Sequence, residues 1–188
     1  MKKDNFLIQK EKQLSKKDLS QIGSWDKKIA GLCNKINKKK NYYTTSSCSG
    51  RIVLLKYSKE KQENAFLFRT HSKIKFNELK KALENAINDF DGIIEFQQTS
   101  CIMHVACKTI FDAQEIVKKA KESGWKRSGI MGGERNMVEL HSTESISFPI
   151  AKNKKILVDD NFIKIVIQIA NSKLERVWKK IKRLNKII

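Results

Sequence analysis

Apolar residues recur at helical spacing near both ends of this 188-residue chain. Residues 2–19 and the segment Trp25–Ile36 place apolar side chains three or four positions apart among polar ones, which predicts two amphipathic helices. Ser24 is a candidate N-cap of the second helix, and the run at 38–41 ends it. The longest predicted helix begins at about Asp159, a good N-cap, and reaches nearly to the last residue.

The middle of the chain alternates short apolar runs with two further amphipathic segments. Helices are predicted at 76–89 and at about 112–122, and Gly124 ends the second. The short apolar runs predict strands at 52–55, 65–68, 93–96, 102–106, 125–131, 137–141, 146–150 and 156–158. This order predicts one mixed α/β domain over 1–188, with a long C-terminal helix and without a regular array of βαβ units.

Three pairs of neighbouring strands are expected to form hairpins. The strands at 52–55 and 65–68 form the first pair, and those at 93–96 and 102–106 form the second. The strand at 125–131 runs into the Gly132–Gly133 turn and pairs with 137–141. Pro149 is expected to end the strand at 146–150.

Two stretches of the chain are loosely alike. Residues 66–83 and 102–117 each give an apolar strand, a histidine, a lysine, a phenylalanine and then a helix. This order hints at an internal duplication of a strand–helix unit.

The polar run from Tyr42 to Arg51 interrupts the apolar pattern, and we expect it to form a loop. It brings together hydroxyls, the Cys48 thiol, a glycine and an arginine, and little in it serves a hydrophobic core. Small hydroxyl residues such as Ser46 expose backbone N–H groups, Gly50 permits a positive φ, and Arg51 offers a planar fork to phosphate or carboxylate. These parts predict an anion-binding loop.

The formal net charge of +19 indicates a large polyanionic partner, either nucleic acid or an acidic membrane surface. The alternative is a solvated, lysine-rich surface without a ligand. No apolar stretch approaches the roughly 20 residues that span a bilayer, so we expect a soluble, intracellular protein. Of the two polyanions, we expect nucleic acid to be the partner rather than a membrane.

Cysteine usage argues against a metal centre. The four cysteines, Cys33, Cys48, Cys101 and Cys107, include no CxxC pair. No tight ligand spacing appears among them and the three scattered histidines, so no metal is expected. Without a secretory signal, free thiols in the cytoplasm are the expectation.

Two histidines and one cationic segment are candidates for chemistry. His71 ends an apolar strand and His104 lies inside one, so either is a candidate base or a satisfied structural histidine. The segment around Lys126, Arg127 and Ser128 repeats the cation and hydroxyl chemistry of the polar run. Its neighbour Trp125 is either a base-stacking or a core residue.

Several stretches together resemble the tRNA wybutosine-synthesizing protein 3 family. They occur in the family's order and span nearly the whole chain: Tyr43–Ile52, Met103–Cys107, Ser123–Ile130, Ser142–Thr143, Pro149 and Ala170–Leu174. The resemblance implies a fold unlike the usual Rossmann methyltransferase. It also implies an S-adenosylmethionine-dependent enzyme that methylates the N4 nitrogen of the tricyclic wyosine intermediate. That base lies just 3′ of the anticodon in tRNA-Phe.

The resemblance also suggests roles for the candidate residues. His104 or His71 is the expected general base, and Ser46, Ser47, Cys48, Gly50 and Arg51 are expected to bind the cofactor. Substrate binding is expected at Arg51, Lys126, Arg127 and Ser128.

Three other interpretations stay open. A non-catalytic tRNA- or RNA-binding module explains the charge and the aromatics. A hydrolase or transferase that uses Cys48 as its nucleophile is the second, and a structural scaffold is the third.

Overall fold

The computed structural model describes residues 4–16, 26–58, 64–133 and 136–188, and these confirm a mixed α/β fold. They form five helices and two antiparallel sheets. In chain order the elements are α1 (Asn5–Leu14), α2 (Lys27–Lys38), β1 (Tyr42–Cys48), β2 (Arg51–Lys56), β3 (Phe66–Thr70), α3 (Phe76–Asp89), β4 (Ile93–Thr99), β5 (Ile102–Cys107), α4 (Ile110–Glu122), β6 (Gly129–Ile130), β7 (Met137–His141), β8 (Ile146–Lys152), β9 (Lys155–Ile156) and α5 (Asp160–Ile187). None of these described helices is long and apolar enough to cross a membrane.

The chain folds into two compact units, each built around one sheet. Unit 1 is drawn from Met1–Ser49, Cys101–Thr143 and Val177–Ile188, and unit 2 from Gly50–Ser100 and Glu144–Arg176. Helix α5 contributes its first part to unit 2 and its last part to unit 1.

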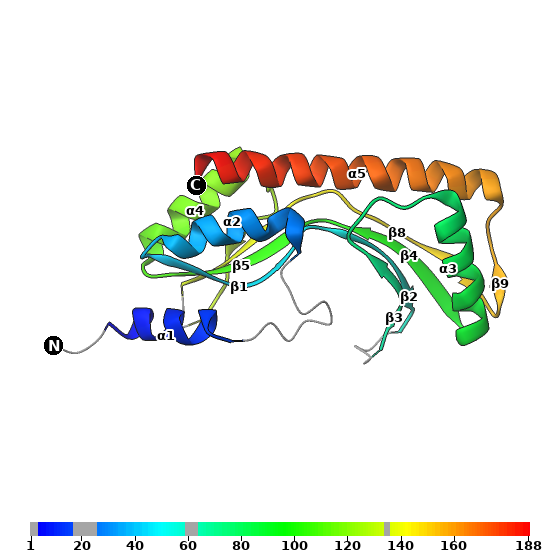
Figure 1. Ribbon diagram of the computed structural model, residues 1–188, viewed down its shortest axis with the longest axis horizontal. Helices are drawn as coiled ribbons and strands as arrows, with labels where there is room; N and C mark the ends of the chain where they lie inside the picture. Colours follow the sequence, from blue (N-terminus) through cyan, green and yellow to red (C-terminus); the bar gives the residue numbers. More distant parts are fainter. Residues whose placement is uncertain (1–3, 17–25, 59–63, 134–135) are drawn as a thin grey trace. The chain divides into compact units, whose positions relative to one another are not determined.

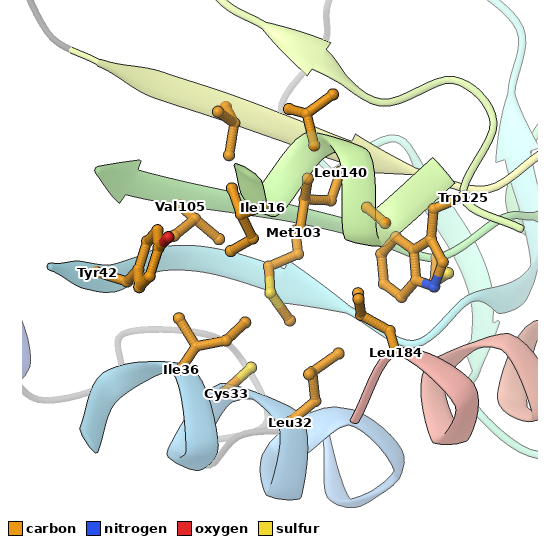
Figure 2. Close-up of a cluster of buried hydrophobic side chains, with 14 of the residues drawn as sticks. Leu32, Cys33, Ile36, Tyr42, Met103, Val105, Ile116, Trp125, Leu140 and Leu184 are labelled. Carbon is orange, nitrogen blue, oxygen red and sulfur yellow. The ribbon is translucent and has the colours of Figure 1, made fainter. Parts of the chain in front are cut away.

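Unit 1 contains a four-stranded sheet in the order β1-β5-β7-β6. Strands β1 and β5 of this sheet lie side by side in Figure 1. Helices α2 and α4 and the end of α5 bury their apolar faces on one side of this sheet, in one core. Figure 2 shows Leu32 and Ile36 of α2 on one side of that core and Met103 of β5 on the other. Trp125 is fully buried in the same cluster, so it is a core residue.

Helix α1 lies against the opposite side of β1 (Figure 1). The rings of Phe6 and Tyr43 meet at 5.2 Å, and the side-chain amide of Gln13 donates to the Thr45 carbonyl at 3.5 Å. The helix begins after Asp4, whose carboxylate accepts from Phe6 N, and ends at Leu14. It is shorter than the predicted 2–19, of which residues 2, 3 and 17–19 lie outside the described part.

Unit 2 contains a five-stranded sheet in the order β3-β2-β4-β8-β9. The rings of Phe96 and Phe148 stack across β4 and β8 at 5.4 Å, and Phe162 of α5 meets Phe148 edge-on. Leu79 and Leu83 of α3 are fully buried, as the helical spacing of that segment predicts.

The expected loop at Tyr42–Arg51 is wrong, because most of it is strand β1. Residues 42–48 pair with β5 in antiparallel register, and Tyr42, Tyr43 and Thr44 are buried. Aromatic and β-branched residues suit a pleated surface with both sides covered, so the hydroxyls here belong to a strand. Only Ser49 and Gly50 form the turn into β2, and Gly50 has φ +88°, as its predicted conformational role requires.

The expected hairpin between 93–96 and 102–106 is also wrong. Strand β4 pairs with β2 and β8 in unit 2, whereas β5 pairs with β1 and β7 in unit 1. The short connection between Thr99 and Ile102 therefore joins two strands, β4 and β5, that belong to different sheets. Strand β8 continues past Pro149 to Lys152, because a register shift against β4 accommodates the proline. Strand β6 covers only 129–130 of the expected 125–131.

Other local predictions are confirmed. The hairpin of β2 and β3 and the pairing of β6 with β7 both form. Asp159 caps α5 by accepting from Phe162 N at 2.8 Å, and Gly124 follows α4 with φ +94°. The predicted N-cap of α2 is wrong: Asp26 caps the helix by accepting from Lys28 N, and the predicted cap, Ser24, lies outside the described residues.

Candidate active site

Three polar residues form a row across the four-stranded sheet of unit 1. Ser46 on β1 lies opposite His104 on β5, and His104 lies opposite Glu139 on β7. The flanking residues of β5 and β7, such as Met103 and Leu140, are buried in the core beneath α2, α4 and α5. Because side chains alternate along a strand, the polar row faces the side of the sheet away from that core.

A bulge in β1 brings Ser46 into the row. Thr44 pairs with Val105 and Ser46 pairs with His104, so two residues on β1 advance the register by one on β5. Thr44 is held on the helix-covered side, where Asn37 of α2 bonds both its hydroxyl and its backbone N–H. With regular pairing Ser46 would take the same side as Thr44, so the extra residue Thr45 turns Ser46 toward His104.

Direct contacts connect the row. Ser46 Oγ lies 2.8 Å from His104 Nδ1, and His104 Nε2 lies 3.2 Å from Glu139 Oε2. An ionised Glu139 carboxylate can only accept. Neutral His104 then carries its proton on Nε2 and donates it to Glu139, which leaves Nδ1 to accept the Ser46 hydroxyl. Ser46 is exposed at the open end of this chain of hydrogen bonds.

His141 extends the row along β7. Its Nδ1 lies 3.8 Å from Glu139 Oε1, so one carboxylate faces two imidazoles. Burial lowers the pKa of His141 below its ordinary value; the positive charge of Arg127 acts in the same direction, and the negative charge of Glu139 opposes it. His141 is therefore a neutral acceptor or donor near neutral pH.

The predicted segment Lys126–Ser128 lies beside this row. Arg127 N donates to the His141 carbonyl at 3.1 Å, while the side chains of Lys126 and Arg127 are exposed. Ser128 is buried, and its hydroxyl donates to the Trp125 carbonyl at 2.7 Å and accepts from His141 N at 3.1 Å. Ser128 thus fastens the segment to β7, and the two cations next to it remain accessible.

The other hydroxyl and thiol side chains of the polar run from Tyr42 to Arg51 lie in different surroundings. Ser47 points to the helix-covered side and accepts from Cys33 Sγ at 3.4 Å, and burial raises the pKa of that thiol to about 11. Ser49 N donates to the Asp26 carboxylate at 3.0 Å, at the start of α2. Cys48 is half-buried, and all four cysteines are free thiols.

The remaining predicted residues belong to unit 2. His71 lies after β3, with Nδ1 3.2 Å from the Gly50 carbonyl, so neutral His71 carries its proton on Nδ1 and presents Nε2 as an acceptor. The Arg51 guanidinium lies 4.8 Å from the centre of the Phe66 ring. Its Nε is buried and has no hydrogen-bond partner among the described residues. The structure therefore joins Ser46 with His104 in unit 1, and Gly50 with His71 in unit 2.

Sequence reasoning missed Glu139 and His141 as site residues. The signal was available in strand β7, where the buried residues Val138 and Leu140 alternate with the polar residues Glu139 and His141. Two ionisable groups on one face of a short strand are unusual unless that face is solvated or functional.

Known proteins resemble this chain over most of its length. A protein of Methanocaldococcus jannaschii named tRNA(Phe) 7-((3-amino-3-carboxypropyl)-4-demethylwyosine(37)-N(4))-methyltransferase is 36% identical over 177 residues, which cover 91% of this chain and 90% of that protein. A Danio rerio protein named tRNA wybutosine-synthesizing protein 3 homolog is 32% identical over an alignment of 192 residues that covers 98% of this chain and 75% of that protein.

The fold has solved counterparts. A structure from Pyrococcus horikoshii OT3 is 32% identical, covers 97% of this chain and 93% of its own, and superposes with a TM-score of 0.86. The family model described as Methyltransferase TYW3 matches residues 1–188. The chain therefore belongs to the Methyltransferase TYW3 family.

Proposed function

We propose that this chain transfers a methyl group from S-adenosylmethionine to the N4 nitrogen of the tricyclic wyosine intermediate in tRNA-Phe, at the base 3′ of the anticodon. Family membership and the printed names of both relatives support the reaction and the substrate. The formal net charge of +19 suits a polyanionic RNA. The observation that carries the catalytic part is the hydrogen-bonded row of Ser46, His104 and Glu139.

The row supplies a path for the proton that N4 loses. When bound, S-adenosylmethionine supplies an electrophilic methyl group on a positively charged sulfur, which keeps the electron pair of the broken bond. Ser46 Oγ takes the proton from N4 as its own hydroxyl proton passes to His104 Nδ1, along the 2.8 Å contact. Glu139 faces the resulting imidazolium at 3.2 Å and stabilises its charge. His104 is the base in this scheme, and Ser46 relays the proton.

The residues predicted to bind cofactor and substrate lie in different surroundings. Arg51 fits a carboxylate, of the cofactor or of the aminocarboxypropyl side chain, because its buried Nε lacks a partner among the described residues. The exposed Lys126 and Arg127 are suited to tRNA phosphates. Ser47 and Ser128 have their hydroxyls occupied within unit 1, so we assign them to holding β1 and β7 in place.

We place the activity in the cytoplasm, in one functional domain over 1–188. The free thiols suit a reducing compartment. Methyl transfer to nitrogen needs neither a metal nor a cysteine nucleophile. We keep His71 as an alternative general base. We keep Cys48 and Gly50 as secondary candidates for cofactor binding.

Methyl transfer to precursor tRNA-Phe tests the proposal. Purified protein, labelled S-adenosylmethionine and tRNA carrying the demethylated intermediate should yield the N4-methylated nucleoside, identified by mass spectrometry. Ser46→Ala should slow transfer about a hundredfold, within the usual range for loss of a proton-transfer group. Ser147→Ala is the matched control, because Ser147 is an exposed strand serine of unit 2. A wild-type protein that binds tRNA but neither binds the methyl donor nor modifies the base would be a binding module, and the proposal would fail.

A further inference from the structure

A pocket of about 410 Å³ opens in unit 2 between β3 and α3, apart from the residues discussed so far. Nine residues line it: Phe68, Arg69, Thr70, Lys73, Ile74, Glu78, Lys81, Ala82 and Asn85. Its volume falls within the usual range for small-molecule sites, about 300–1,000 Å³. We call it the β3–α3 pocket.

One wall of the pocket includes the loop between β3 and α3, residues 71–75. Hydrogen bonds to the backbone of this loop hold it in place. The Asn171 side chain of α5 accepts from Ile74 N at 3.0 Å and donates to the Ile74 carbonyl at 2.9 Å. Lys75 N donates to the Glu78 carboxylate at 2.6 Å, at the first turn of α3. The Thr70 hydroxyl accepts from Ser72 N at 3.1 Å. These contacts preform the pocket before any ligand arrives.

The pocket combines a positive rim with an apolar base. Arg69, Lys73 and Lys81 contribute three positive charges, against the single carboxylate of Glu78. Lys73 is also paired with Glu175, whereas no ion pair to Lys81 is found among the described residues. Ile74 and Ala82 are buried beneath the rim, beside the half-buried ring of Phe68.

We infer that the β3–α3 pocket binds one nucleotide of single-stranded RNA. Its phosphate would lie between Arg69 and Lys81, and its base would rest on the apolar surface that includes Phe68. A phosphate would form an ion pair with Lys81, for which no ion pair is found among the described residues, whereas a neutral metabolite would not. The apolar surface at the bottom of the pocket suits a ligand with a planar or apolar body. The inference rests on the proposed function, since a tRNA substrate brings an unpaired anticodon loop to the protein.

Salt-dependent RNA binding tests this site. The probe is the fluorescently labelled anticodon stem-loop of tRNA-Phe, titrated by anisotropy at several salt concentrations. Lys81→Gln should weaken binding about tenfold and reduce the slope of log K against log salt by about 0.7, the value for one single-strand phosphate contact. Lys81→Arg should retain wild-type binding, because it keeps the charge and a phosphate donor. Lys152→Gln is the charge-matched control, since Lys152 is exposed in unit 2 and does not line the pocket.

Two outcomes overturn the inference. If Lys81→Gln and Lys152→Gln weaken RNA binding equally, the effect would come from the net charge of the protein and not from the pocket. Binding of adenosine monophosphate that depends on Lys81, with RNA binding unchanged, would assign the pocket to a free nucleotide instead. Thermal melts of each variant, monitored by circular dichroism, check that Lys81→Gln leaves the fold intact, as expected for an exposed side chain.

Methyl-transfer kinetics separate this inference from the proposed function. Lys81→Gln should raise KM for tRNA about tenfold and leave kcat unchanged, because the pocket holds a nucleotide that does not react. If wild-type protein methylates tRNA and Lys81→Gln has the same KM, the pocket inference fails and the function stands. If wild-type protein methylates nothing but Lys81→Gln still weakens RNA binding, the function fails and the pocket stands.

Discussion

Replacing Glu139 with glutamine should slow methyl transfer while leaving tRNA binding intact. The substitution keeps the shape of the side chain and removes the charge 3.2 Å from His104 Nε2. Both side chains are partly solvated, with 25% of His104 and 36% of Glu139 exposed, so we use the dielectric constant of water. Two unit charges at this separation then interact by about 1.3 kcal/mol. Since this interaction arises only when His104 takes the proton, its loss should lower kcat about tenfold.

Single-turnover kinetics on precursor tRNA-Phe measure this effect directly. The expected pattern is a lower rate of transfer with an unchanged KM, since Glu139 is assigned no contact with the RNA. Glu95→Gln is the control, because Glu95 is a half-buried strand glutamate of unit 2. The double variant Ser46→Ala/Glu139→Gln should lose less than the product of the two single losses, because both residues act through His104. A Glu139→Gln enzyme with wild-type kcat, or fully multiplicative losses, would refute the relay.

Other predictions concern stability. Because burial lowers the pKa of His141 below 6.5, the unfolded chain binds more protons there than the folded chain. The contribution of this residue to stability should be complete above pH 6.5 and should fall as pH drops through the lowered pKa; urea unfolding across pH should show this, and His141→Gln should flatten the trend. Met103→Ala should lower the free energy of unfolding, measured with urea, by about 2–5 kcal/mol, because Met103 is fully buried. Leu157→Ala, at an exposed position, should change it by no more than about 0.5 kcal/mol. Gly124→Ala should lower the thermal midpoint, with a cost of about 1 kcal/mol or more, because Gly124 has φ +94° and an added Cβ would lie 3.0 Å from Lys180 Cε. An unchanged midpoint would show that the turn after α4 can relax.

Local sequence patterns predicted most helices and several strand pairs. The spacing of Leu79 and Leu83 predicts the buried face of α3, and Asp159 caps α5, because both features depend on residues within a few positions of each other. The hairpin of β2 and β3 follows in the same way from two apolar runs on either side of a polar turn.

Predictions failed where distant partners decide the conformation. The hydroxyl-rich residues 42–48 were expected to form a loop, yet α1 covers Tyr43 and the core buries Tyr42, so a strand became the favourable state. Strands β4 and β5 are close in sequence, but they complete different sheets. Local propensity carries no information about which sheet a strand will join.

The candidate site divides in the same way. Residue types and motif spacing were enough to single out Ser46 and His104 and, through the family resemblance, the reaction. The connection between them depends on the bulge at Thr45 and on the register that places Glu139 opposite His104. Register is set by pairing between strands that are far apart in the chain; Ser46 and His104, for example, are 58 positions apart. The core side chains constrain which face of each strand can point inward. The chemistry of each residue is therefore encoded locally, whereas its hydrogen-bonding partners exist only after the sheet has formed.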